Sequence, residues 1–212
     1  MDKAERIRNE KLGASLIKAL SLRHFDAYYC ASSSEAAEKI LSLIPKTDVV
    51  SWGGSMTMEA LGVIDRVKKG GWRVIDRSTA QSQEEKIEIT RSALLCDTYL
   101  TGANAISEDG EIVNVDGNGN RVAAMTFGPK SVIVACGMNK VVKTAEDAIS
   151  RARNTAAPVN AQRFDIRTPC KTTGTCADCK STDSICSYIV RTRLCKPAGR
   201  IKVVLVGEAL GF

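Results

Sequence analysis

The 212-residue sequence has little of several features that define large classes of protein. It contains one histidine, His24, at the end of an amphipathic segment. That position favours a helix-end role over a catalytic Ser–His or Cys–His pair. No apolar run approaches the roughly 20 residues of a membrane-spanning helix, which argues against an integral membrane protein. The charged first residues lead into no apolar signal core, so we expect a cytoplasmic protein with no membrane partner.

Two common nucleotide-binding motifs are absent as well. No Gly-x-Gly-x-x-Gly follows the first predicted strand, and no Gly-Lys-Ser/Thr occurs, which excludes the usual Rossmann and Walker signatures. Aromatic residues make up 5% of the chain, and the segment 161–200 contains only Phe164 and Tyr188. Single-stranded nucleic acids are commonly bound by stacking on aromatic side chains, so nucleic acid ranks last among the expected partners.

Positive charge and cysteine are concentrated in the last third of the chain. Residues 1–150 hold 19 Lys and Arg against 20 Asp and Glu, whereas residues 151–212 hold 11 against 4. The formal excess of +6 therefore arises entirely in the C-terminal part. Five of the eight cysteines lie between positions 170 and 195. In a reducing compartment, clustered cysteines are more often metal ligands or redox groups than disulfides.

Residues 1–160 alternate between the patterns of strands and of amphipathic helices, and we expect them to form one domain. Strands are predicted over residues 25–30, 48–52, 72–76, 98–101, 111–115, 121–124 and 131–135. Strands that are separated by helices imply crossover connections and a parallel sheet covered on both faces. The predicted fold is therefore α/β: an open, mostly parallel sheet with helices on both faces.

Two connections lead to specific expectations. The turn signal Asp116-Gly117-Asn118-Gly119-Asn120 predicts a hairpin between the strands over 111–115 and 121–124. The apolar run that starts at Ile201 predicts a strand, and we expect residues 201–212 to rejoin the main sheet. The segment 161–200 would then be a small, cysteine-rich excursion from the core.

The spacing Cys170-x5-Cys176-x2-Cys179-x6-Cys186 predicts a metal site in this excursion. Short loops close at low entropic cost, so the four thiolates can converge on zinc or on a 4Fe–4S cluster. Zinc and the cluster remain alternatives at this point, as does a metal-free or disulfide-bonded loop. No role is assigned to Cys195.

Three loops at predicted strand ends are candidates for binding a small anionic ligand, because open α/β sheets bind ligands beyond the carboxyl ends of their strands. Glycines let backbone N–H groups approach an anion, and a lysine adds a mobile positive charge. Ser55 has the alternative role of capping a helix. The candidate ligand-binding residues are Gly53, Gly54, Ser55, Thr101, Gly102, Asn104, Gly137, Asn139 and Lys140.

These loops also resemble those of a known family. The segments Ser51-Trp52-Gly53-Gly54-Ser55, Thr101-Gly102-Ala103-Asn104-Ala105-Ile106, Gly119-Asn120-Arg121-Val122 and Gly137-Met138-Asn139-Lys140 are similar to the LUD domain of lactate utilisation proteins, particularly the small C-type protein. The resemblance implies a fold shared with ribose-5-phosphate isomerases and CoA transferases. It also implies an accessory role in the oxidation of lactate to pyruvate, with iron–sulfur proteins of that system as partners. Homo-oligomer formation is a further expectation.

Ser107-Glu108-Asp109-Gly110 is similar to the Ser-Glu-Asn-Gly motif that carries the nucleophilic glutamate of CoA transferases. A carboxylate can attack an acyl-CoA to form an enzyme-bound intermediate, which makes Glu108 a candidate catalytic residue. An ordinary turn before the next strand is the alternative. The competing functions are therefore an accessory protein that binds an anion and a metal or iron–sulfur centre, a CoA transferase-like or sugar-phosphate isomerase-like enzyme using Glu108, and a metal-stabilised nucleic-acid-binding tail.

Overall fold

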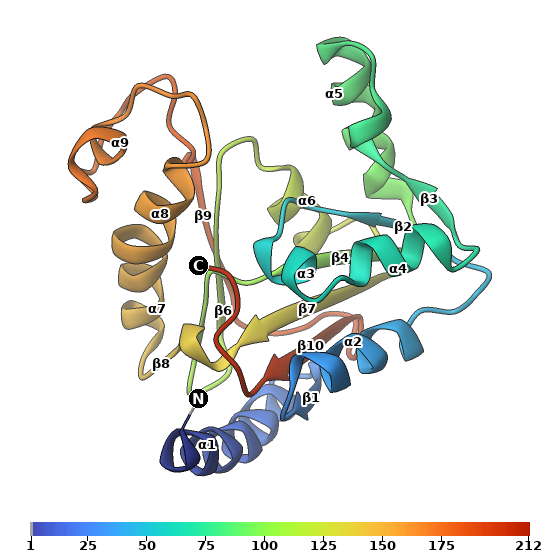
Figure 1. Cartoon of the computed structure of the whole chain (residues 1–212), viewed down its shortest axis with the longest axis vertical. Coiled ribbons are helices and arrows are strands. Elements are labelled where there is room, and N and C mark those ends of the chain that lie inside the picture. Colours follow the sequence, from blue (N-terminus) through green and yellow to red (C-terminus); the bar gives the residue numbers. More distant parts are fainter. Residues whose placement is uncertain (1) are drawn as a thin grey trace.

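The computed structural model describes residues 2–212, which form two β-sheets and the helices around them (Figure 1). The strands are β1 (Asp26–Cys30), β2 (Val49–Trp52), β3 (Arg73–Ile75), β4 (Thr98–Gly102), β5 (Ala105–Ser107), β6 (Ile112–Asp116), β7 (Ser131–Gly137), β8 (Val141–Val142), β9 (Tyr188–Thr192) and β10 (Ile201–Val206). The α-helices are α1 (Lys3–Leu22), α2 (Ser33–Ser42), α3 (Met56–Ala60), α4 (Val63–Lys69), α5 (Gln83–Ser92), α6 (Asn120–Thr126), α7 (Ala145–Arg151), α8 (Ala157–Ala161) and α9 (Pro169–Thr173).

The larger sheet has six parallel strands in the order β1-β10-β7-β4-β2-β3. The predicted open, mostly parallel α/β fold is confirmed. Strand β10 lies inside the sheet, between β1 and β7, although it comes last among the strands along the chain. Because parallel strands need crossovers, the helices must cover the faces of this sheet.

Side chains of β7 show how both faces are buried. Val132 and Val134 pack into one hydrophobic cluster with α1, α6 and the second sheet, whereas Ile133 and Ala135 pack into another with α2, α3 and α4. This alternation follows from the period of two in a strand. The helix α5 lies outside both clusters and has no buried residue.

The smaller sheet has the order β8-β5-β6-β9 and packs against α7. Strands β5, β8 and β9 are absent from the sequence-based prediction because two of them have only two or three residues and β9 lies in the polar, basic segment. Strand β9 pairs antiparallel with β6 from Tyr188 to Thr192, so the second half of the cysteine-rich segment is joined to this sheet.

The predicted hairpin over residues 111–124 is wrong, because residues 120–126 form helix α6 instead of a second strand. The carboxylate of Asp116 accepts hydrogen bonds from the backbone N–H groups of residues 118, 119, 121 and 122, and Gly119 precedes the helix with φ = 79°. The turn signal is real, but Asp116 and Gly119 together start a helix, so the chain does not return as a strand.

Within residues 2–212, the structure contains no helix with the length and hydrophobicity that a membrane span requires.

Candidate anion-binding site

The three predicted ligand-binding loops meet at one edge of the larger sheet. Strands β7, β4 and β2 are parallel neighbours, so the loops that follow them lie side by side. The backbone N–H of Gly53 donates to the carbonyl of Leu100 at 3.1 Å. A Cβ atom on Gly102 would lie 2.8 Å from the Ser55 hydroxyl oxygen, so only glycine allows this close approach. The loops after β2, β4 and β7 are therefore neighbours at this edge.

Lys140 is the most unusual residue at this edge. Its side chain reaches between the loops, donating to the Thr57 hydroxyl at 2.9 Å and to the carbonyl of Ala103 at 3.4 Å, and it is 3% exposed. No carboxylate of residues 2–212 forms an ion pair with it. Burial lowers the pKa of Lys140. The nearby Cys136 acts to raise this pKa, and the positive charges of Arg151 and Arg121 act to lower it further. A buried ammonium group without a counter-ion is costly, which makes this position attractive for an anion.

Arg121 and Arg151 were not predicted as site residues, and both increase the positive charge around Lys140. Arg121, in the first turn of α6, pairs with Asp116 at 3.6 Å and donates to the Asn104 side-chain oxygen at 2.9 Å. Burial lowers its pKa, while Asp116 acts in the opposite direction. The Gly119-Asn120-Arg121-Val122 segment of the family resemblance is the one signal in the sequence that pointed to Arg121.

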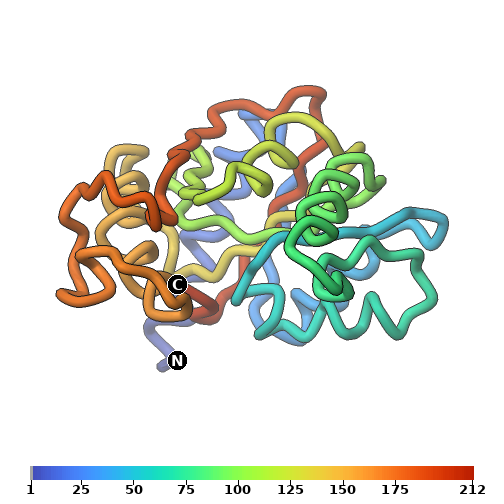
Figure 2. The backbone as a smooth tube through the Cα atoms, turned by 90° about the horizontal axis from the view of Figure 1, so that it is seen from above, coloured from blue at the N-terminus to red at the C-terminus, as the bar shows by residue number. Residues whose placement is uncertain are grey.

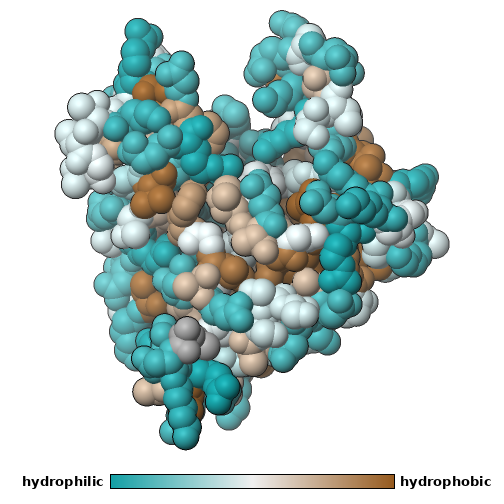
Figure 3. All heavy atoms as spheres, viewed as in Figure 1, coloured by the Kyte–Doolittle hydropathy of each residue, from teal (hydrophilic) through white to brown (hydrophobic). Residues whose placement is uncertain are grey.

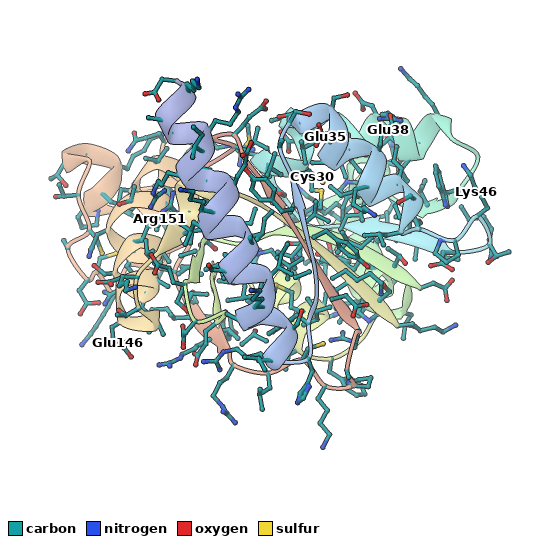
Figure 4. The ribbon with its side chains drawn as sticks, turned by 90° about the horizontal axis from the view of Figure 1, so that it is seen from below. Cys30, Glu35, Glu38, Lys46, Glu146 and Arg151 are labelled. Atoms are coloured by element: carbon teal, nitrogen blue, oxygen red, sulfur yellow. The ribbon has the colours of Figure 1, made fainter. Side chains whose placement is uncertain are left out.

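Arg151 comes from the last residue of α7 and donates to the backbone carbonyl of Asn104. Figure 4 shows it at one end of α7, with Glu146 at the other end. Glu146 pairs with Arg191 of β9 at 3.2 Å, so α7 links the smaller sheet to the edge of the larger one. Burial also lowers the pKa of Arg151.

Several predicted ligand-binding side chains are instead used to build the framework. Asn104 accepts from the backbone N–H of Val115 at 2.9 Å as well as from Arg121, and the buried Thr101 hydroxyl donates to the carbonyl of Gly102 at 3.3 Å. The Ser55 hydroxyl accepts from the N–H of Met58, so it caps α3. Since α3 has five residues, its amino terminus is not a strong anion site by itself. Lys140 is therefore the predicted residue with the clearest capacity for a ligand.

The C-terminal tail lies directly over Lys140. A Cβ atom on Gly211 would lie 3.0 Å from the Lys140 amino nitrogen and 2.7 Å from the Thr57 hydroxyl. Asn139 holds the tail by accepting a hydrogen bond from the N–H of Leu210 at 3.1 Å, and a side chain on Gly137 would collide with that contact. Figure 3 shows this face of the molecule, where apolar and neutral side chains occupy the middle between two projecting polar arms.

A cavity of about 350 Å³ adjoins this edge beyond β2 and β3. Gly53, Gly54 and Ser55 form one wall, and Arg77 and the Lys68–Asp76 ion pair (2.6 Å) form another. Within residues 2–212, the half-buried Arg77 guanidinium has no hydrogen bond or ion pair; it lies 3.2 Å from where a Gly54 Cβ atom would be.

Tyr99 lies next to Gly53, one of the residues that line the cavity. A Cβ atom on Gly53 would lie 3.0 Å from the Tyr99 hydroxyl, and the side chain is 2% exposed. Burial raises the pKa of Tyr99 to about 12, although Arg77 and Arg121 act to lower it. The hydroxyl is therefore protonated at neutral pH and is available as a hydrogen-bond donor.

Glu108 lies in the turn between β5 and β6, away from these groups. Its carboxylate pairs with Lys143 at 2.6 Å, and Gly110 of the same turn packs against the backbone of Ala19 and Leu20 in α1. No hydrogen bond or ion pair within residues 2–212 joins Glu108 to Lys140, Arg121 or Arg151. His24 follows the end of α1 with φ = 67°, and its backbone N–H donates to Ser21.

The four predicted metal ligands are found together in another part of the molecule. Cys170, Cys176, Cys179 and Cys186 all line a cavity of about 80 Å³, and none of the eight cysteines forms a disulfide. Within residues 2–212, no three His, Cys, Asp or Glu side chains are arranged to hold a metal ion. Cys195 is buried elsewhere, where its sulfur accepts from the N–H of Ile201 at 3.2 Å.

Comparisons with known proteins agree with the family resemblance. The sequence pattern of the LUD domain matches residues 14–206. A DUF162 family protein from Deinococcus radiodurans is similar in structure, with a TM-score of 0.53 and 14% identity over 95% of this chain and 97% of that chain. Ribose 5-phosphate isomerase A from Neisseria gonorrhoeae is more distant, with a TM-score of 0.35 and 15% identity over 53% of this chain and 54% of that chain. No functionally curated protein matches the sequence.

Proposed function

Since the chain belongs to the LUD domain family, we propose that it is an accessory protein of lactate utilisation that binds a small carboxylate or phosphate at the edge of its larger sheet. The ligand's negative charge would lie against Lys140, with Thr57 and the nearby arginines around it. This assignment concerns binding, and no chemical step is assigned to the site.

The observation that carries the proposal is the buried amino group of Lys140, which has no carboxylate partner within residues 2–212. A protein can relieve such a charge by losing the proton or by binding an anion. Thr57 and Ala103 accept two hydrogen bonds from the amino group, which keeps it pointing between the loops. Arg121 and Arg151 strengthen the positive potential, and within residues 2–212 Asp116 is the one carboxylate that pairs with either of them.

The adjoining cavity supplies the space for the rest of a small ligand. The Arg77 guanidinium lines this cavity and has no other partner within residues 2–212, so it can donate hydrogen bonds to such a ligand. The ligand would meet Lys140 only if the tail around Gly211 moves, because that tail now lies over the amino group. Binding should therefore increase the exposure of residues 209–212.

The direct test measures binding of lactate, pyruvate and inorganic phosphate to the full chain by calorimetry, with chloride as the control anion. Binding of one of these anions that is lost in Lys140→Met and kept in Lys143→Met supports the proposal. Lys143 is a matched control because it is three residues away, exposed, and paired with Glu108. Equal binding by both variants would place the anion elsewhere.

The role in the cell needs a separate test, because anion binding alone does not define it. A strain that lacks this protein should grow poorly with lactate as its carbon source and normally with a sugar. Restored growth with the wild-type chain, but not with Lys140→Met, would link the site to that role. Normal growth of the deletion strain on lactate would contradict it.

A further inference from the structure

We propose that Cys170, Cys176, Cys179 and Cys186 hold a 4Fe–4S cluster in the cavity that they line. This inference goes beyond the proposed anion site, since the two sites share no residue. Seen from above, the orange segment that carries the cysteines lies at the side of the molecule opposite the cyan loop before β2 (Figure 2).

The first argument is that four donors from different local structures face the same small volume. Cys170 comes from α9, Cys176 and Cys179 from the irregular chain that follows it, and Cys186 from just before β9. All four are half-buried and none forms a disulfide. Four free thiols around one cavity are unusual in a loop unless they share a ligand.

The second argument concerns what else holds this segment in place. Residues 174–187 contain no helix or strand, and none of them belongs to the buried part of a hydrophobic cluster. A few polar contacts brace them. The Asp183 carboxylate accepts from the Arg167 N–H at 2.9 Å, and the Ser181 hydroxyl donates to the carbonyl of Arg167 at 3.3 Å. Loops of this length without a core are commonly ordered by a bound metal centre, whose binding energy replaces hydrophobic packing.

The third argument identifies sulfur as the donor. The only histidine, His24, lies at the end of α1. The two carboxylates within residues 174–187 are already paired, Asp178 with Arg153 and Asp183 with Arg167. The four thiols are therefore the available ligands, and an all-cysteine set is typical of zinc and of iron–sulfur clusters.

The arrangement of the thiols favours the cluster over zinc. A single zinc ion needs donors that meet about 2.3 Å from one point. The four cysteines instead line a common cavity of about 80 Å³, which is more space than a single ion occupies. In a 4Fe–4S cubane the iron–sulfur core itself occupies the space between the four thiolates, which bind the iron atoms at its corners.

The wall of the cavity suits a cluster with a net negative charge. Ala157, Pro158, Ile185 and Ile189 provide apolar surface that limits contact with water, and Arg153 provides a positive charge next to the sulfurs. A 4Fe–4S centre with four thiolates has a formal charge of about −2 in its oxidised state, which the basic residues of the segment offset.

The experiment uses the full chain purified without oxygen, with assays for iron, acid-labile sulfide and zinc. We expect about four iron and four sulfide per chain, a brown colour with absorbance near 400 nm, and an EPR signal after reduction by dithionite. A colourless protein that contains one zinc per chain, or no metal after anaerobic reconstitution with iron and sulfide, would overturn the proposal.

Variants separate the four cavity cysteines from the rest. Replacing any one of them by serine should at least halve the iron content. Cys30→Ala should leave the iron content unchanged, since Cys30 is buried in the hydrophobic cluster with α2, α3 and α4. Limited proteolysis gives a readout that does not need a variant: oxidative removal of the cluster should speed cleavage within residues 174–187. An unchanged cleavage rate after iron loss would contradict a cluster in this cavity. Because Lys140→Met should keep its iron, failure of the anion proposal and failure of the cluster proposal are distinguishable.

Discussion

Replacing Lys140 by methionine tests the anion site through two effects of opposite sign. Methionine has a similar length and fills the same space without a charge. The variant loses two hydrogen bonds, which cost about 1 kcal/mol each, but it removes a buried ammonium group whose effective penalty is several kcal/mol. We therefore expect the free energy of unfolding without ligand to rise by about 2 kcal/mol, or roughly 4–8 °C in Tm for a chain of this size.

The effect on binding should be the reverse. Removing one partner of a buried, hydrogen-bonded charge pair costs about 2–5 kcal/mol, so the Kd for the anion should rise by roughly 30-fold or more. The assay is thermal unfolding of wild type, Lys140→Met and Lys143→Met with and without the anion that calorimetry identifies. A variant that is less stable than wild type without ligand, yet equally stabilised by the anion, would refute the reasoning.

The pH dependence of the free energy of unfolding is a further check on whether Lys140→Met stabilises the protein. Burial lowers the pKa of Lys140 in the folded state below its ordinary value of 10.5. Between these two pKa values the unfolded state binds more protons, so the stability of wild type gains a contribution as pH rises through this window. Below the window the penalty is fully present, and above it both states are neutral. The advantage of Lys140→Met should thus shrink as pH approaches 10.5.

Three other predictions concern the framework and the alternative function. Glu111, 3% exposed, pairs with Arg191 and with Arg23, and the hydrogen bond from Arg191 lowers the pKa of Glu111. The stabilising contribution of the Glu111 carboxylate is therefore present above pH 4.5 and is lost as pH falls through the lowered pKa. Glu111→Gln should lower the free energy of unfolding by about 3 kcal/mol at neutral pH and flatten the acid side of the stability profile measured by urea unfolding. Arg200 donates to three carbonyls at and after the end of α6, at 2.7 to 2.9 Å. Arg200→Met should therefore lower the free energy of unfolding by about 3 kcal/mol, whereas Lys130→Met, at an exposed position, should lower it by less than about 0.5 kcal/mol. Glu108→Ala should change stability by less than about 0.5 kcal/mol and leave anion binding intact; a large loss of binding, or of any activity found, would instead favour the CoA transferase-like alternative.

Sequence patterns predicted the strands of the larger sheet because each carries a run of apolar, aromatic or β-branched residues long enough to be recognised. Strand β8 has two residues and β5 has three, so neither has a measurable period. Strand β5 pairs with β6, and β8 pairs with β5. The hairpin error has a different origin. The turn residues were identified correctly, but the choice between strand and helix after Gly119 depends on the Asp116 carboxylate, which binds four backbone N–H groups only in the folded chain.

The candidate site shows the same division between local and distant information. Lys140 was predicted from its place after a strand, whereas its burial and the absence of a carboxylate partner depend on the tail, α6 and α7. Arg151 is a single arginine in an ordinary helix, and nothing local marks it. The four cysteines were recognisable because their spacing is short, so their meeting depends little on the rest of the fold.

The position of β10 in the larger sheet has a consequence for synthesis on the ribosome. In residues 2–212, β1 pairs with β10 and with no other strand, and about 170 residues separate them along the chain. At 5–20 residues per second, β1 waits roughly 10–35 s after leaving the ribosome before its neighbour exists. During that time its edge and the apolar face of α1 lack their partners, and they are exposed to chaperones and to other nascent chains. Completion of the larger sheet therefore waits until β10 has been synthesised, and the yield of this protein in the cell should depend on chaperone supply more than its final stability would suggest.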